Sequence, residues 1–480
     1  MGFFLRHRWD EHGISPFGNA PQWPTDNPLN TIFFAIVLIA FLVAGFRQLT
    51  WTPPAPGTGT GPGGEAASQG PMQDLATAMI DAAAGSVTLA LGLVGVMALF
   101  LGLMKVAEEG GLLVIIARTV RPLMVRLFPD VPADHPAMGA MILNMAANAL
   151  GLGNAATPFG IRAMQQLETL NTSPGTASNA MVLFLAINTS SVTLLPTGVI
   201  ALRAAAGSMD PAGILPTTLF ATICSTTVAI IMAKLCQNYW PVPSEELAAA
   251  EWKTAMAGAG AIEGPASEGA AEIISADADE GYPAWVSGLA LAGIAALVPL
   301  TIVYGRAIAP WIIPGLMVGL LGFGVLRRVN VYEAFVEGAK DGFQVALRII
   351  PYLVAILVAV AMFRSSGAMD WIVGPLGAVT GLVGLPADAL PMALLRPLSG
   401  SGAYGILASI IQDPAIGPDS YIGYLVSTFQ GSTETTFYVL AVYFGAIGIR
   451  RIRHALVAAL AADIAGIAAA VAIVSYLYGP

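Results

Sequence analysis

The stretch that decides the fold comprises residues 144–160, NMAANALGLGNAATPFG, which lie between two long apolar runs. A helix that crosses the hydrocarbon core of a bilayer needs about 20 mostly apolar residues, so the asparagines at 144, 148 and 154 are not needed for insertion. Glycine and proline at this depth free backbone groups that lipid cannot satisfy. The segment must therefore lie against protein or a wet cavity.

Thr157 and Pro158 in this stretch are typical of a helix start, because threonine caps helices and proline is favoured at the first helical position. We therefore expect a helix that stops near residues 151–154 and restarts at Pro158. Broken helices of this kind bind substrates and ions in membrane transporters. A kinked helix that packs through its small residues is the structural alternative, and the sequence leaves both open.

The composition predicts an all-α, polytopic membrane protein. The 480 residues are 56% hydrophobic and 11% charged, with a mean hydropathy of +0.73, whereas soluble domains carry about 25% charged residues. The apolar runs are continuous, which excludes the ten-residue alternation of an outer-membrane barrel, and we count about ten membrane segments. The net charge of −9 and the lack of a basic stripe argue against a nucleic-acid partner.

The chain divides at an acidic linker, residues 241–282, between a first half, 1–240, and a second half, 283–480. This linker combines nine acidic residues with alanine, glycine and serine, so it cannot form a packed core and is expected to be solvated. The two cysteines and four histidines are scattered. They indicate neither a disulfide framework nor a metal site.

The two halves repeat one layout. Residues 184–207, FLAINTSSVTLLPTGVIALRAAAG, pair without gaps with residues 425–448, LVSTFQGSTETTFYVLAVYFGAIG, and each copy has an early cluster of hydroxyl side chains. We expect residues 180–204 and 421–447 to form continuous spanning helices. A second interrupted segment, residues 391–410, contains the sequence RPLSGSG and corresponds to the segment around residue 150.

Basic residues near helix ends give the orientation. Arg327, Arg328 and Lys340 in one loop, and the three arginines at 450–453 in another, predict cytoplasmic loops. Counting crossings then places the N-terminus and the linker inside and the C-terminus outside, so the two halves are inverted. An inverted repeat allows one central site to open to either face of the membrane.

We interpret Glu434 as the one acidic residue deep in a long apolar run, where an ionisable group is costly and usually faces a cavity or a partner. Arg396 in the second interrupted segment is its expected partner. We predict that Glu434 couples transport to an ion, a proton or sodium, with no other cofactor. The structural alternative is a buried ion pair that only fixes helix packing.

Amide and hydroxyl side chains form the predicted binding surface, because they suit a small polar solute through directional hydrogen bonds. Singly, each of them is better explained as a helix cap or a contact between helices. The predicted solute-binding residues are Asn144, Asn148, Asn154, Thr157, Asn188, Thr189, Ser190, Ser191, Arg396, Ser399, Ser401, Gln430, Ser432 and Thr433. Arg203, near the end of its apolar run, is expected to reach the membrane interface without binding anything.

Several motifs carry a family resemblance. LNMAANALGLGNAATPFGIRAM and FLAINTSSVTLLPTGVIALRA resemble spore maturation protein A, whereas RPLSGSGA and QGSTETTFYVLAVYFGAIGIRR resemble spore maturation protein B. Both relatives carry the nucleoside-recognition, or Gate, domain, which is similar to the core of concentrative nucleoside transporters. The resemblance implies two Gate-type halves, fused here in one chain, and a transport-type core.

We therefore predict a secondary transporter of a small polar solute, including a nucleoside-like one, in the inner (plasma) membrane. Two alternatives stay open: a scaffold or assembly factor for envelope or spore maturation, and a channel. No nucleotide-binding loop and no Ser-His-Asp set is visible in the sequence, so we expect neither an ATP-driven pump nor an enzyme. The expected partners are the solute and the lipid bilayer, and a homo-oligomer is left open.

Overall fold

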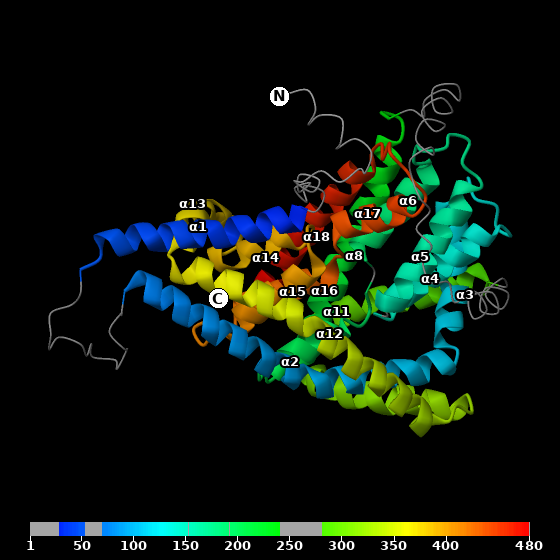
Figure 1. Cartoon of the computed structure of the whole chain (residues 1–480). Coiled ribbons are helices and arrows are strands. Elements are labelled where there is room, and N and C mark those ends of the chain that lie inside the picture. Colours follow the sequence, from blue (N-terminus) through cyan, green and yellow to red (C-terminus); the bar gives the residue numbers. More distant parts are fainter. Residues whose placement is uncertain (1–27, 53–69, 152, 192, 241–280, 480) are drawn as a thin grey trace, which may run out of the picture. The chain divides into compact units, whose positions relative to one another are not determined.

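A computed structural model describes residues 28–52, 70–151, 153–191, 193–240 and 281–479 (Figure 1). These residues form helices, joined by turns and by one isolated bridge between Thr176 and Arg451, which confirms the all-α prediction. The predicted linker lies outside the described residues except for positions 281 and 282. The helices are α1 (Pro28–Thr50), α2 (Pro71–Glu109), α3 (Leu112–Leu127), α4 (Pro136–Ala149), α5 (Gly153–Glu168), α6 (Asn179–Ser190), α7 (Thr197–Ala205), η1 (Pro211–Ile214), α8 (Leu215–Cys236), α11 (Ala284–Leu326), α12 (Val331–Ser365), α13 (Ala368–Thr380), η2 (Gly381–Val383), η3 (Ala387–Ala389), α14 (Leu390–Leu395), α15 (Gly400–Gln412), α16 (Tyr421–Ser432), α17 (Thr436–Gly445) and α18 (Ala455–Tyr478).

The chain forms two compact units. The first contains Met1–Met79 and Ala359–Ala368, and the second contains Ile80–Val358 and Met369–Pro480. In the first unit, the Arg47 guanidinium at the end of α1 donates to the Ser366 carbonyl over 2.8 Å, and the Gln48 side chain accepts from the Met72 amide. All the interrupted helices belong to the second unit.

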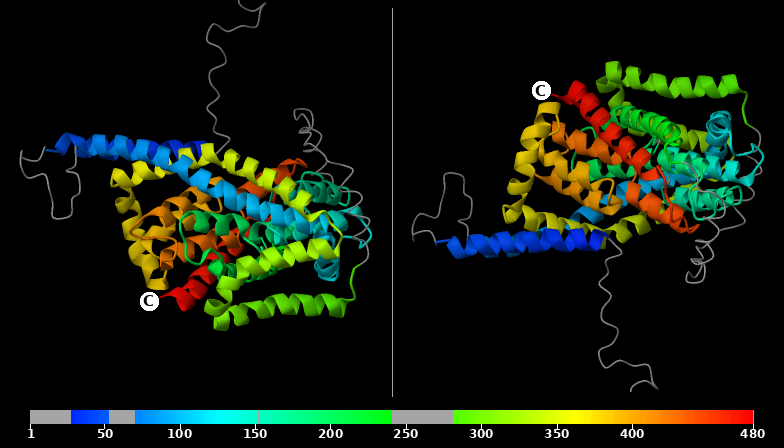
Figure 2. Two further views of the ribbon diagram at one scale, coloured as in Figure 1. Left: turned by 90° about the horizontal axis from the view of Figure 1, so that it is seen from below. Right: turned by 90° about the horizontal axis from the view of Figure 1, so that it is seen from above.

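Helices α8 and α18 pack side by side through the second unit, with α6 and α16 against them (Figures 1 and 2). The contact face of α18 is made of small residues, including Ala459, Ala462 and Gly466, which are buried. Small residues let two membrane helices approach closely, so that van der Waals contacts and polar side chains can hold them together. Because the two helices are close, the Ser225 hydroxyl of α8 donates directly to the Ala462 carbonyl of α18 over 2.8 Å.

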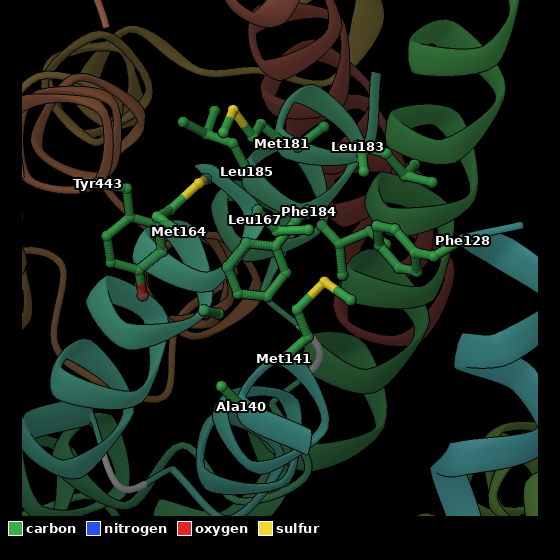
Figure 3. Packing of buried hydrophobic residues seen from close by; sticks show 14 of the residues in the cluster. Phe128, Ala140, Met141, Met164, Leu167, Met181, Leu183, Phe184, Leu185 and Tyr443 are labelled. Carbon is green, nitrogen blue, oxygen red and sulfur yellow. The ribbon is translucent and has the colours of Figure 1, made fainter. Parts of the chain in front are cut away.

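A hydrophobic cluster lies beside this pair and joins α4, α5 and α6 to α17 of the other half. Figure 3 shows Phe184, Met141, Met164 and Leu167 packed together, with Tyr443 at the edge of the cluster and its hydroxyl pointing away from Met181. The rings of Phe184 and Tyr443 stack with their centroids 6.1 Å apart. This packing fixes the position of the Tyr443 hydroxyl relative to α4 and α6.

Among the described residues, four helices are long and apolar enough to cross a membrane: Phe33–Thr50, Pro71–Glu109, Pro211–Cys236 and Ala455–Tyr478. Gly374–Val383 and Ala387–Leu395 form a pair bent by 103°, which adds a fifth span if it is counted as one. Our prediction of about ten segments also counts the interrupted helices and apolar runs within α11 and α12, of which only shorter apolar stretches are found among the described residues. The chain is a helical membrane protein.

The two halves are inverted relative to each other, as predicted. The turn before α6 meets the turn after α17, where the Arg450 and Arg451 amides donate to the Gly175 carbonyl over 2.9 and 3.0 Å. The turn after α7 meets the turn before α16, where Arg203 pairs with Asp419 at 3.0 Å. The segment 179–205 therefore runs antiparallel to the segment 421–445.

The repeat extends to the helix caps. Ser178 caps α6 by accepting from the Met181 amide, and Ser420 caps α16 by accepting from the Gly423 amide. Behind α7 and α17, Gly207 and Gly448 both have positive φ, 79° and 68°. The capping serines are 242 positions apart in the sequence, and the glycines are 241 positions apart. Our gapless pairing uses the offset of 241 throughout, so it is wrong by one residue before the break.

Candidate functional site

The first interruption separates α4 from α5. Helix α4 ends at Ala149, and Gly151 then takes the left-handed backbone conformation with φ 73°. A Cβ atom there would collide with the Leu195 carbonyl oxygen, so this turn requires glycine. The Leu194 amide donates to the Ala149 carbonyl over 2.9 Å and satisfies one of the free carbonyls at the end of α4.

The predicted break is thus confirmed, but the predicted restart is wrong. Helix α5 begins at Gly153 and contains Pro158 in its interior. Because α5 begins at Gly153, the chain is already helical when it reaches Thr157, which therefore does not cap the helix. The backbone of Asn154 lies in the first turn of α5, and its side chain is outside the described part of the chain.

The second interruption lies between α6 and α7, where we expected a continuous helix over residues 180–204; that prediction is wrong. Ser191 ends α6 with φ 36°, and α7 begins only at Thr197, directly after Pro196. Proline has no amide hydrogen, and serine and threonine hydroxyls compete for backbone groups, so this sequence disfavours an uninterrupted helix. Thr222 of α8 takes up the freed backbone groups, because its hydroxyl donates to the carbonyls of Ser190, at 3.0 Å, and Ser191.

The third interruption, between α14 and α15, confirms the break predicted in residues 391–410. Arg396 and Pro397 follow α14, and Ser399 caps α15 by accepting from the Gly402 amide over 3.0 Å. Arg396 is buried, with 4% of its surface exposed. Ser401 lies in the first turn of α15 and is exposed.

The fourth interruption, residues 433–435, divides the segment 421–447, which we also expected to be one helix. Thr433 is extended, with φ −137° and ψ 162°. Arg396 holds this conformation, since its guanidinium donates to the Thr433 carbonyl and, over 3.0 Å, to the Thr435 hydroxyl. The Glu434 carboxylate lies 3.7 Å from the same guanidinium, which confirms the predicted pair, and its side chain is 46% exposed.

Backbone hydrogen bonds connect all four interruptions. The hydrogen bond from the Leu194 amide to the Ala149 carbonyl, described above, joins the first interruption to the second. The Glu434 amide donates to the Thr189 carbonyl over 2.8 Å, which joins the second to the fourth, and the Phe437 amide donates to the Pro397 carbonyl over 3.0 Å, which joins the fourth to the third. The unwound parts of both halves therefore meet in one cluster, which we call the break cluster.

Three predicted amides lie together at the α4–α6 side of the break cluster. The Asn148 side chain donates to Asn188 over 2.9 Å, and the Asn144 side chain donates to the Ala156 carbonyl over 2.7 Å. The Tyr443 hydroxyl of α17 approaches both Asn144, at 3.1 Å, and Asn188, at 3.4 Å. Tyr443 was not predicted, because an aromatic residue in an apolar run has no distinctive sequence signal.

The neighbouring hydroxyls bond to the backbone or to other hydroxyl side chains. Thr189 and Ser190 donate to the carbonyls of Ala186 and Ile187 in their own helix, and Ser190 also donates to Thr226. Ser191 shares a hydrogen bond of 2.9 Å with Thr193. These contacts are the structural roles that single hydroxyls commonly take in membrane helices.

Several buried polar atoms in and beside the break cluster have no hydrogen-bond partner among the described residues: Asn144 Oδ1, Arg396 Nε, Gln430 Oε1 and Ser432 Oγ. An unsatisfied buried donor or acceptor costs about 1–3 kcal/mol. Donors and acceptors are both present, so the cluster can bind a polar molecule through hydrogen bonds. It can equally hold ordered water.

Asp463 in α18 is a second acidic residue in an apolar run, and our sequence reasoning overlooked it. It is 3% exposed, and its Oδ2 accepts from the Thr436 hydroxyl over 2.7 Å. The sequence signal was available, because Asp463 interrupts a run of alanines and isoleucines in the last apolar segment. Only the structure shows that Asp463 lies beside the start of α17.

Arg203 does not reach the membrane interface as expected but is fully buried. It pairs with Asp419 at 3.0 Å, donates to the Pro418 carbonyl over 2.6 Å and lies 4.2 Å above the ring of Tyr424. Asp210, in the turn after α7, lies close to this arginine; burial raises the pKa of its carboxyl group, and the Arg203 charge opposes that effect. These contacts lock the two halves together at one end.

The fold and the break cluster define a class of protein: a helical membrane protein whose core consists of two inverted, interlocked copies with interrupted helices. The nucleoside recognition (Gate) family model matches residues 90–206 and 346–450, which include all four interruptions. Spore maturation protein B of Bacillus subtilis is 48% identical over 167 residues, which cover 35% of this chain and 93% of that protein.

Spore maturation protein A of Bacillus subtilis is 48% identical over 163 residues, which cover 34% of this chain and 83% of that protein. The inner membrane protein YjiG of Escherichia coli is 33% identical over 84 residues, which are 17% of this chain and 55% of that protein. The chain belongs to the family of the spore maturation proteins A and B. No solved structure matches it.

Proposed function

We propose that this protein is a secondary transporter that moves a small polar solute across the inner membrane, driven by a proton or sodium gradient. The observation that carries the proposal is the break cluster, in which four interruptions from two inverted halves meet, because their unwound residues form hydrogen bonds with one another or with neighbouring helix ends. In secondary transporters, substrates and coupling ions bind at such interruptions, and the inverted halves move against each other around them.

The chemistry of the break cluster favours a polar solute of low charge. Its free atoms include amide oxygens, at Asn144 and Gln430, and one guanidinium N–H, at Arg396. Amide oxygens accept hydrogen bonds from hydroxyl or amine groups, and a guanidinium donates to carbonyl oxygens. A nucleoside carries all of these groups, which agrees with the description of the matching family.

Glu434 is the proposed coupling residue in this cycle. Its carboxylate is half-exposed and is paired with Arg396. The carboxylate can therefore exchange Arg396 for a coupling ion without moving through the buried core. The proposed orientation keeps the N-terminus in the cytoplasm.

The direct test measures flux into liposomes that contain the purified protein. Radiolabelled uridine, and a panel of neutral sugars and amino acids, should show saturable uptake that depends on a pH or sodium gradient for at least one solute. Glu434→Gln should reduce gradient-driven uptake at least tenfold and leave the thermal unfolding temperature nearly unchanged.

A scaffold in envelope or spore maturation is the second candidate, and the names of the two Bacillus relatives favour it. It predicts no flux of any solute in the panel, which would contradict the transporter proposal. Conductance without saturation or coupling would instead identify a channel.

A further inference from the structure

Asp463 has an unusual environment for a carboxyl group. It lies in α18 with 3% of its surface exposed, between the small residues Ala462 and Gly466. Its Oδ2 accepts from the Thr436 hydroxyl over 2.7 Å, and its Oδ1 has no hydrogen-bond partner among the described residues. A carboxyl group that is desolvated to this extent and has one neutral partner is costly to keep ionised, unless a cation or a proton compensates its charge.

Thr436 connects this carboxyl group to the fourth interruption. It is the first residue of α17 and directly follows the fourth interruption. Its neighbour Thr435 receives a hydrogen bond of 3.0 Å from Arg396, which also holds Glu434. Polar contacts therefore lead from the half-exposed Glu434 through Arg396 to Thr435, and the next residue in the chain, Thr436, contacts the buried Asp463.

Few other charges face Asp463. Helices α6, α8, α16 and α17 pack against α18. Among them, α6 has no ionisable side chain, α8 contributes Cys224, Cys236 and Lys234, and α16 and α17 contribute only tyrosines. Arg396 and its partner Glu434 are thus the charged groups on the path to Asp463, and one guanidinium has two carboxyl groups to balance.

We propose that Asp463 is a proton-binding site, and that Thr436 transmits its protonation state to the interruption between α16 and α17. The proton comes from water and returns to water. With Asp463 ionised, Oδ2 accepts from Thr436 and anchors the start of α17; with a proton bound, the carboxyl group is neutral and this anchor weakens. A metal cation would need several more oxygen ligands than the two side chains supply. The role of this site in coupling rests on the proposed transport function, whereas proton binding itself does not.

The first experiment is independent of transport. Infrared difference spectra of the purified protein in vesicles, recorded between acidic and neutral pH, should contain a carboxyl C=O band that Asp463→Asn removes. Asp388→Asn, a matched change at an exposed aspartate in η3, should retain the band. Thr436→Val, which removes only the hydroxyl, should shift the band without abolishing it. Identical spectra for Asp463→Asn and the parent would overturn the proposal, and loss of the band on addition of sodium chloride at constant pH would identify a sodium site instead.

The second experiment tests coupling with radiolabelled uridine in the same vesicles. Asp463→Asn should exchange internal for external uridine at a rate within about twofold of the parent, yet lose accumulation driven by a pH gradient. Accumulation equal to that of the parent would contradict the coupling role. If the parent itself moves no uridine, the proposed nucleoside transport fails, while the infrared result still decides whether Asp463 binds a proton.

Discussion

Arg396 shows how one side chain can determine the backbone path of another segment. Its guanidinium donates to the Thr433 carbonyl and the Thr435 hydroxyl, across a separation of 37 to 39 residues. Lysine cannot reproduce this, because its ammonium group lacks the planar fork that reaches two acceptors and a carboxylate together. The interruption between α16 and α17 therefore depends on arginine at this position.

Arg396→Ala should lower the free energy of unfolding by about 3 kcal/mol, because it leaves buried acceptors and one carboxylate without a partner. Glu434→Gln should cost less than about 1 kcal/mol, since its side chain is 46% exposed and the pair is screened. Denaturant unfolding of the purified variants in detergent measures both. Equal losses for the two variants would show that the ion pair, and not the contacts to Thr433 and Thr435, holds the interruption.

His454 precedes α18, is 1% exposed and packs against Trp240. Burial, and to a lesser extent the charge of Arg453, lowers its pKa from 6.5 to about 4. The unfolded chain therefore takes up a proton at a higher pH than the folded protein does. Stability should be fully present above about pH 6.5 and should fall by up to about 3 kcal/mol as the pH drops towards about 4. Thermal unfolding against pH should show this slope, and His454→Gln should flatten it; an unchanged slope would exclude His454 as its source.

Contacts between helices of opposite halves depend on glycine. A Cβ atom at Gly198 of α7 would lie 2.6 Å from the Tyr404 hydroxyl of α15, and one at Gly160 of α5 would overlap the Tyr443 hydroxyl of α17. The two contacts pair α7 with α15 and α5 with α17, as the pseudo-twofold relation between the halves requires.

Gly198→Ala should therefore destabilise the protein by about 1–3 kcal/mol through overpacking. Tyr404→Phe removes the atom in closest contact and should restore most of the loss when the two changes are combined. Gly445→Ala is the control, because nothing lies within 4 Å of a Cβ atom there. The melting temperatures of the parent, the two single variants and the double variant measure the coupling between Gly198 and Tyr404. Additive effects in the double variant would contradict the contact.

The sequence predicted two of the interruptions that contain glycine or proline, but missed the one that ends at Pro196. It predicted the interruptions near Gly151 and Pro397. It wrongly placed the start of α5 at Pro158. It failed at residues 433–435, because no local residue there forbids a helix and the cause is a guanidinium from a distant segment. Arg203 was misjudged for the same reason, since its partner Asp419 is 216 residues away. Long-range polar contacts of this kind leave no periodic trace in a sequence.

For the whole molecule, inversion makes a prediction about sidedness. The turn that contains Thr172 and the turn that contains Met209 lie at opposite ends of the segment 179–205, and both residues are exposed. In a variant without Cys224 and Cys236, Met209→Cys should react with an impermeant maleimide added outside intact cells, whereas Thr172→Cys should react only after the cells are opened. The reverse pattern would place the N-terminus outside, and equal labelling of both would show that the segment 179–205 does not cross the membrane.

The locks between the halves also constrain how the protein can be synthesised. Arg203 and Asn144 cannot form these contacts until Asp419 and Tyr443 have been synthesised. The ribosome adds each of these partners more than 200 residues later. During that interval these charged and amide groups of the first half lack their partners from the second half. Assembly must therefore be largely post-translational, and a gene cut within the codons for residues 241–280 should still yield a working pair, in line with two relatives that exist as separate polypeptides.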